Sequence, residues 1–116
     1  MSDAIGLTIP AGRRFESVVS LVLGGIGSRL DLPVSRIDDL RLAVANVAEG
    51  AAGSELVLRI DVHSDRVSLR VGPLETGAGV DRARRVLIDP LMDGVTAVEE
   101  EGLDWLELDV NRGDGG

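Results

Sequence analysis

Asn46, Glu49 and Gly50 are the first candidates for chemistry, because they share one side of a predicted helix. Glu49 follows Asn46 by three residues and Gly50 by four, so both lie one turn from it. An amide oxygen and a carboxylate at this spacing could hold a divalent cation. Two candidate ligands without a further acidic cluster make a poor metal site, and we predict no bound metal.

The glycine-rich segment GPLETGAG, residues 72–79, is a second candidate, because glycines can cradle a phosphate. Its Gly77 and Gly79 flank one alanine, a spacing that matches neither GxGxxG nor the phosphate-loop signature. We therefore interpret this segment as a flexible loop.

Three arginines at the start of the next predicted helix, Arg82, Arg84 and Arg85, could bind an anion through their guanidinium groups. Asp81 and Asp89 flank them in the sequence. This arrangement favours a solvated helix face with compensated charge over an anion site.

His63 and Trp105 are the single residues of their types in the chain. His63 lies on the polar face of a predicted hairpin, and no second histidine or cysteine accompanies it. We therefore predict neither a catalytic nor a metal-binding role for it. Trp105 falls on the charged face of the last predicted strand, where it could mark a contact surface or simply cover the sheet.

Composition excludes several classes of function. The net charge is -8, and all 12 cations are arginines, so the chain should repel nucleic acid and has no lysine for Schiff-base chemistry. It contains no cysteine, which fits a reducing cytoplasm. The sequence shows no signal peptide and no apolar run of about 18 residues, so we expect neither export nor membrane insertion.

Hydrophobic periodicity predicts the elements that position these residues. The central one is a helix over residues 35–52, capped by Ser35, whose apolar stripe consists of Ile37, Leu40, Val44, Val47, Ala48 and Ala51. A helix over residues 13–32 precedes it, and a helix over 80–93 ends or kinks at Pro90. Period-two alternation predicts strands over residues 5–9, 56–62, 67–71, 95–99 and 103–110, the first of them at a sheet edge.

This order predicts one α+β domain over residues 1–110, followed by a flexible tail over 111–116. The expected architecture is a two-layer sandwich. Its sheet is mixed, mostly antiparallel and of about five strands, with three helices on one face.

The runs LTIPA, IDDLRLAV and LIDPLMD resemble the scaffold of the bacterial anti-sigma-factor serine kinases. Those kinases belong to the histidine-kinase-like ATPase superfamily, and the resemblance extends from about Ile5 to Val110. It implies the histidine-kinase-like ATPase fold, an ATP and magnesium site, and protein partners. The partners would be a sigma factor, an anti-anti-sigma antagonist, a paralogous kinase or a second copy of the chain.

The functional motifs of that family are altered at each aligned position. Asn46 stands where the family has a catalytic glutamate, and Gly50 where it has the asparagine that coordinates magnesium. Pro73 falls where the family places the aspartate that hydrogen-bonds adenine. Proline offers no side-chain acceptor and no backbone donor.

Arg82 and Arg84 stand near the glycines that shape the family's lid over the nucleotide. Long side chains there would block the close backbone approach to phosphate that glycine permits, although their charge could still attract an anion. Few residues separate Pro73 from the following helix, so most of the usual lid is absent.

We therefore predict a noncatalytic, anti-sigma-like protein-binding module without ATP or another cofactor, in which Arg13, Arg14 and Trp105 are candidate partner contacts. The alternative is an ATP-dependent anti-sigma serine/threonine kinase with a rearranged site, in which Glu49 or Glu75 replaces the lost catalytic glutamate. A dimerisation partner of a genuine kinase is a further possibility.

Overall fold

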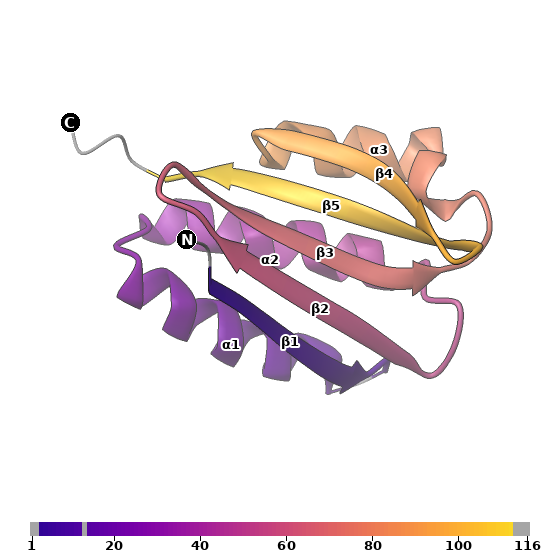
Figure 1. The fold of residues 1–116 in the computed structure, drawn as a ribbon, viewed down its shortest axis with the longest axis horizontal. Coiled ribbons are helices and arrows are strands. Elements are labelled where there is room, and N and C mark those ends of the chain that lie inside the picture. Colours follow the sequence, from indigo (N-terminus) through magenta and orange to yellow (C-terminus); the bar gives the residue numbers. More distant parts are fainter. Residues whose placement is uncertain (1–2, 13, 113–116) are drawn as a thin grey trace.

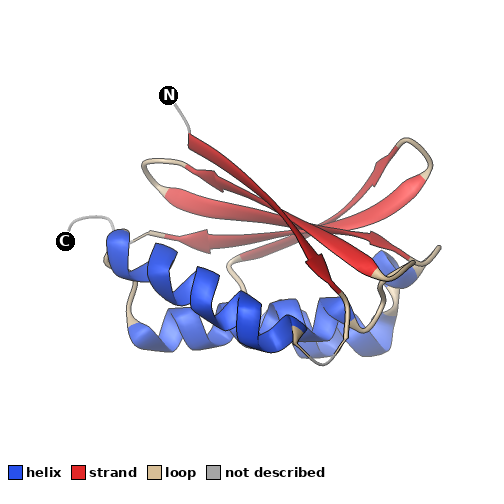
Figure 2. Cartoon of the chain, turned by 90° about the horizontal axis from the view of Figure 1, so that it is seen from below, coloured by secondary structure: helices blue, strands red, loops and turns tan. Residues whose placement is uncertain are grey.

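A five-stranded sheet carries the helices on one face (Figures 1 and 2). The computed structural model describes residues 3–12 and 14–112. The strands are β1 (Asp3–Pro10), β2 (Glu55–Val62), β3 (Arg66–Leu74), β4 (Gly94–Glu100) and β5 (Leu103–Asn111). The α-helices are α1 (Phe15–Arg29), α2 (Val34–Ala48) and α3 (Arg82–Ile88), and two short 3-10 turns, η1 (Ala78–Val80) and η2 (Asp89–Leu91), flank α3.

The strand order is β1-β2-β3-β5-β4, which confirms the α+β sandwich and places β1 at an edge as predicted. Each neighbouring pair of described strands is antiparallel, so this sheet contains none of the parallel pairing that a mixed sheet requires. The physical reason lies in the connections. Short turns join β2 to β3 and β4 to β5, and α1 and α2 together carry the chain back beside β1.

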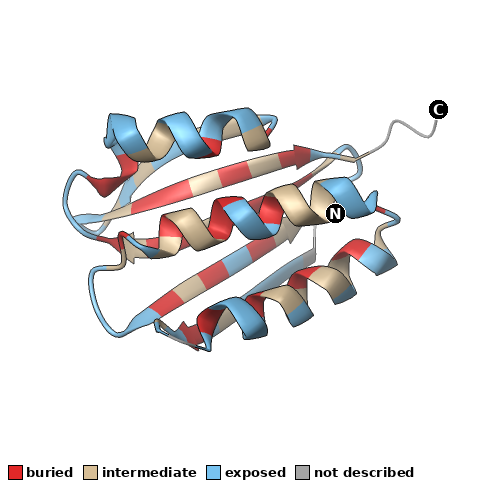
Figure 3. Cartoon of the chain, turned by 180° about the vertical axis from the view of Figure 1, so that it is seen from behind, coloured by how far each residue is buried: buried red, intermediate tan, exposed pale blue. Residues whose placement is uncertain are grey.

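Helix α2 lies in the middle of the helical layer, and its buried residues face the sheet (Figure 3). Leu40, Ala43, Val44 and Val47 are between 0% and 4% exposed. The predicted Ser35 cap is wrong, because the helix already begins at Val34 and Pro33, in the cap position, contributes no side-chain hydrogen bond. The helix also ends earlier than predicted, since Ala51 forms a β-bridge with Leu74 instead.

Two other segments differ from the prediction. Strand β3 continues through Pro73 to Leu74, so the expected loop begins at Glu75. The third helix is broken into η1, α3 and η2, and Pro90 lies in η2, consistent with its inability to continue an α-helix.

Near the C-terminus, β5 extends to Asn111, and the backbone N–H of Arg112 donates to Asp65 O at 2.9 Å. Residues 113–116 of the expected tail lie outside the described residues.

The glycines of α1 have different environments. A Cβ atom at Gly27 would lie 2.5 Å from Cδ1 and Cγ1 of Ile37 on α2, so a larger residue here would have to displace that side chain. A Cβ atom at Gly24 or Gly25 would meet nothing within 4 Å. Close packing therefore explains only one of the three glycines.

We expect Gly27→Leu to lower the free energy of unfolding by about 1–3 kcal/mol, because the new side chain must displace Ile37. The matched variant Gly25→Ala should raise it by up to about 1 kcal/mol, because alanine is the better helix former and nothing is displaced. Urea unfolding followed by circular dichroism measures both. Equal effects of the two substitutions would contradict the packing at Gly27.

Candidate functional site

An open cavity lies where α2 ends, against the loop that follows β3 and the start of α3. Its volume is about 380 Å³, and its lining residues are Glu49, Gly50, Glu75, Thr76, Gly77, Ala78, Asp81 and Arg84. Four of the sequence-predicted pocket residues thus come together here: Glu49, Gly50, Gly77 and Arg84. The other four, Asn46, Pro73, Gly79 and Arg82, are not among the residues that line this cavity.

The side chain of Arg84 reaches back over Gly50. A Cβ atom built on Gly50 would lie 2.8 Å from Arg84 Nη1 and 3.1 Å from the Cβ of Ala78. The guanidinium group therefore occupies the space that a larger residue at position 50 would need. A magnesium ligand at this position requires a side-chain oxygen, and Gly50 has none.

Asn46 is also unsuited to the cavity. Its amide nitrogen donates a hydrogen bond of 2.9 Å to the carbonyl of Leu42, one turn earlier on α2. This bond holds the side chain along its own helix. The amide cannot act as a general base in place of a carboxylate.

A backbone latch joins the end of α2 to the end of β3. The N–H of Ala52 donates to Pro73 O at 3.0 Å, and the N–H of Glu75 donates to Gly50 O at 2.8 Å. Pro73 therefore uses its carbonyl to hold the structure together and has no N–H to offer a ligand. The latch fixes the two positions where the resemblance places metal and adenine contacts.

The cavity lining carries a net negative charge, which repels phosphate. Glu49, Glu75 and Asp81 contribute carboxylates, and Arg84 contributes the single guanidinium group. One carboxylate has a structural role, because Asp81 accepts the N–H of Ala83 at 2.9 Å and caps α3. No side-chain oxygen stands at Gly50, where the resemblance places the magnesium ligand, and three carboxylates against one guanidinium group oppose the charge of a triphosphate.

Asp81 and Glu75 line this cavity, although the sequence offers no reason to place Asp81 there and suggests Glu75 only for a rearranged kinase. Both belong to the segment GPLETGAGVD, so the local signal was the acidic residues around the glycines. Among the described residues, no group of three or more histidine, cysteine, aspartate or glutamate side chains could hold a metal ion.

The two predicted loop glycines lie in different surroundings. The N–H of Gly77 donates to Asp104 Oδ2 at 2.7 Å, and its φ of 84° suits glycine. Gly79 lies instead beside β4 and β5, where its Cβ would be 3.5 Å from the Cβ of Ala97. The loop is thus bonded to β5 at Gly77 and packed against the sheet at Gly79.

The candidate partner contacts are only partly exposed. Arg14 is exposed at the start of α1, and Arg13 lies outside the described residues. The side chain of Trp105 is only 9% exposed, so little of its surface is open to a partner in this structure. A Cβ at Gly72 would be 2.6 Å from the indole ring, which shows that Trp105 fills the space left by this glycine.

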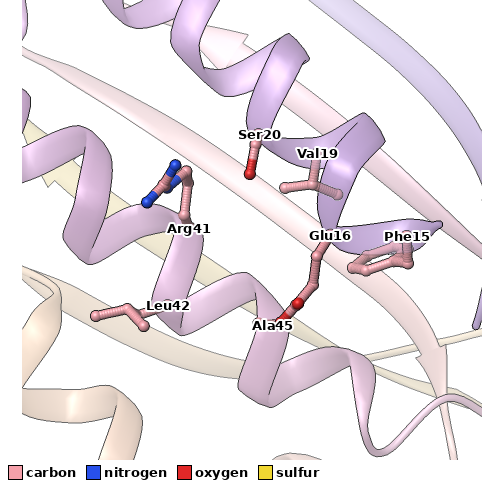
Figure 4. Close-up of a pocket in the computed structure, with 7 residues that line it drawn as sticks. All are labelled: Phe15, Glu16, Val19, Ser20, Arg41, Leu42 and Ala45. Atoms are coloured by element: carbon pink, nitrogen blue, oxygen red, sulfur yellow. The ribbon is translucent and has the colours of Figure 1, made fainter. Parts of the chain in front are cut away.

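A groove lies between α1 and α2, and its lining begins at Phe15, the residue after Arg14 (Figure 4). Its volume is about 170 Å³, and its lining residues are Phe15, Glu16, Val19, Ser20, Arg41, Leu42 and Ala45. The polar ends of Ser20 and Arg41 point into the space between the helices, and Leu42 is 54% exposed. The helical layer therefore offers an accessible surface with apolar and charged groups.

No family model matches the sequence. Among curated proteins, the chain is 27% identical to serine-protein kinase RsbW of Listeria innocua, over 89% of the chain and 84% of that relative. The identity to serine-protein kinase RsbW of Halalkalibacterium halodurans is also 27%, over 87% of the chain and 79% of the relative. The expected family resemblance is confirmed. The chain is similar to the RsbW proteins along most of its length.

The RsbW alignment also measures a difference in length. It spans 132 positions with the Listeria innocua protein, whereas 89% of the 116-residue chain is only about 103 residues. About 29 positions therefore hold a residue in this RsbW protein and none in the chain.

No helix among the described residues is long and apolar enough to cross a membrane.

We expect Asp104→Ala to accelerate amide hydrogen exchange at Gly77 roughly tenfold or more, because the variant removes a charge-assisted hydrogen bond. The matched control is Glu99→Ala, which removes the carboxylate paired across the strands from Asp104 but no bond to Gly77. NMR-detected exchange measures both. Unchanged protection in Asp104→Ala would show that this bond does not hold the loop.

Proposed function

We propose that this protein is a noncatalytic, anti-sigma-factor-like regulator that acts in the bacterial cytoplasm by binding another protein. The binding partner would be a sigma factor or an anti-anti-sigma antagonist. The similarity to the RsbW serine-protein kinases supports the regulatory class. The loss of nucleotide binding is argued from the chain's own residues.

One observation carries the proposal: the guanidinium group of Arg84 covers Gly50, where the family places its magnesium ligand. The position lacks a ligand oxygen, and the space beside it is already taken by a cation. A ligand group that is buried without its hydrogen-bonding partner costs about 1–3 kcal/mol, and more when the group is charged. The missing adenine contact at Pro73 lowers the expected affinity for ATP further.

The short connection from β3 to α3 gives independent support. Only residues 75–81 separate Leu74 from Arg82, and the N–H groups of Glu75 and Gly77 are bonded to the rest of the fold. A segment this short, and attached at two points, cannot close over a triphosphate.

The competing function is that of an ATP-dependent serine/threonine kinase in which Glu49 or Glu75 acts as the base. Both carboxylates line the cavity, which is the observation in its favour. Neither supplies the missing adenine contact, and together with Asp81 they oppose the charge of a triphosphate. The noncatalytic proposal therefore fits the cavity better.

Isothermal calorimetry with Mg-ATP should detect no binding tighter than about 1 mM, because the cavity lacks the metal and adenine contacts. A phosphotransfer assay with an anti-anti-sigma antagonist should detect no product, with serine-protein kinase RsbW of Listeria innocua as the positive control. Micromolar binding together with phosphate transfer would replace this proposal by the kinase alternative.

The proposed partner surface is the α1–α2 groove beside Arg14. We expect Arg14→Glu and Leu42→Glu to weaken sigma-factor binding at least tenfold each, because they reverse an exposed charge and place a carboxylate in an apolar contact. Surface plasmon resonance against each sigma factor of the source bacterium measures the loss. The matched control is Arg59→Glu, an exposed charge reversal on the opposite face of the sheet.

Full binding by both groove variants, with loss in the Arg59→Glu control, would move the partner surface to the open face of the sheet. Failure of every sigma factor and antagonist to bind the unmodified chain would contradict the proposed function itself.

A further inference from the structure

Strand β4 forms one edge of the sheet, where only its β5 side is paired (Figure 1). An edge strand leaves backbone N–H and C=O groups without partners in the sheet. A two-residue turn at Glu101 and Gly102 joins β4 to β5, and both turn residues have a positive φ. In a hairpin of this kind the flanking pair, Glu100 and Leu103, exchanges both backbone hydrogen bonds. This pair sets the hydrogen-bonding pattern of the edge.

The pattern identifies the free backbone groups of β4. Hydrogen-bonded pairs alternate along an antiparallel ladder, so Val98 also bonds toward β5. The N–H and C=O groups of Ala97 and Glu99 therefore point away from the sheet. Among the described residues, no backbone hydrogen bond outside the ladder involves either residue.

The free part of the edge is short, because both of its ends are closed. By the same alternation the carbonyl of Val95 points outward, and it accepts a hydrogen bond of 3.2 Å from Arg85 Nη2. At the other end the strand stops at Glu100. Another chain can thus form its backbone bonds only with Ala97 and Glu99.

A hollow of about 310 Å³ lies beside this free edge. Its lining residues are Thr76, Gly79, Val80, Ala97, Val98, Glu99, Asp104 and Trp105. The side chain of Val80 is 65% exposed, and Ala97 is also exposed. The free backbone groups therefore adjoin an apolar surface with room for a side chain from another segment.

The charge at the hollow is negative. Glu99 and Asp104 contribute carboxylates to the lining, and no arginine is among its residues. Glu100 is compensated by Arg70 at 2.9 Å, whereas no ion pair between described side chains involves Glu99. The hollow therefore favours a segment that carries a positive charge.

We propose that the β4 edge binds an extended, basic segment of a partner protein by adding it to the sheet as an antiparallel strand. Backbone bonds to Ala97 and Glu99 supply affinity, and alternate side chains supply specificity. Residues opposite each other in a sheet have their side chains on the same face. An aliphatic side chain opposite Ala97 thus enters the hollow, and a basic side chain two residues earlier lies opposite Glu99.

A second copy of the chain is a poor occupant of this edge. It would bring another Glu99 and Glu100 to the contact, and two copies with a net charge of -8 repel each other. This inference does not rest on the proposed function, because the hollow shares no lining residue with the groove between α1 and α2.

Fluorescence anisotropy with dye-labelled, end-blocked peptides tests the proposal. A peptide with arginine, threonine and valine in that order, flanked by threonines, should bind saturably with a Kd below about 1 mM. Glutamate in place of the arginine should weaken binding at least about tenfold, because it faces Glu99. Methylation of the valine amide nitrogen should weaken it similarly, because the methyl group removes the N–H that donates to the carbonyl of Ala97.

The variant Glu99→Arg should reverse the preference, so that the glutamate peptide binds at least about tenfold more tightly than the arginine peptide. The matched control is Thr96→Arg, which adds a cation to the same strand on the opposite face of the sheet and should leave the preference unchanged. Circular dichroism should show that both variants fold.

No saturable binding of the arginine peptide would overturn the proposal. Binding that survives methylation of the valine amide, or a preference that Thr96→Arg reverses as fully as Glu99→Arg, would also overturn it. Sedimentation velocity provides the remaining check. Self-association of the unmodified chain that Glu99→Arg abolishes would assign the edge to a second copy and contradict the proposal.

Discussion

Burial of one face of α2 against the sheet is the interaction on which the rest of the structure depends. Ala43, Val44 and Val47 are fully buried, and Leu40 is 4% exposed. Removing a valine or leucine side chain from water contributes about 1.5–3 kcal/mol. Because α2 contacts α1, α3, β3 and β5, this one helix holds the helical layer to the sheet. Its C-terminal end therefore has a fixed position, and the candidate cavity is built around that end.

Backbone hydrogen bonds hold the lining of the cavity in place independently of its side chains. The backbone latch between the ends of α2 and β3 uses N–H and C=O groups, which do not depend on the side chains at positions 50 and 73. Glycine and proline can therefore occupy these positions without breaking the fold. Arg84 then fills the space above Gly50, and three carboxylates surround the remaining cavity. These carboxylates oppose the charge of a triphosphate.

Hydrophobic periodicity predicted the strands and the central helix because the buried face of each element repeats with its own period. It could not predict contacts between distant segments. Ala51 fits the helical stripe, but its backbone pairs with Leu74. Trp105 alternates onto the charged face of β5, yet it is buried because Gly72 on the neighbouring strand leaves room for its ring. The cavity lining shows the same limit, since Glu49 and Glu75, which are distant from Arg84 in the sequence, become its neighbours only in the folded chain.

The central claim is that the pocket at the end of α2 no longer accepts a nucleotide. A titration of the isotopically labelled chain with ATP and magnesium, followed through the backbone amide resonances of Gly50, Glu75 and Gly77, tests it most directly. The account predicts no saturable shift at these amides. Saturable, magnesium-dependent shifts at all three would contradict it.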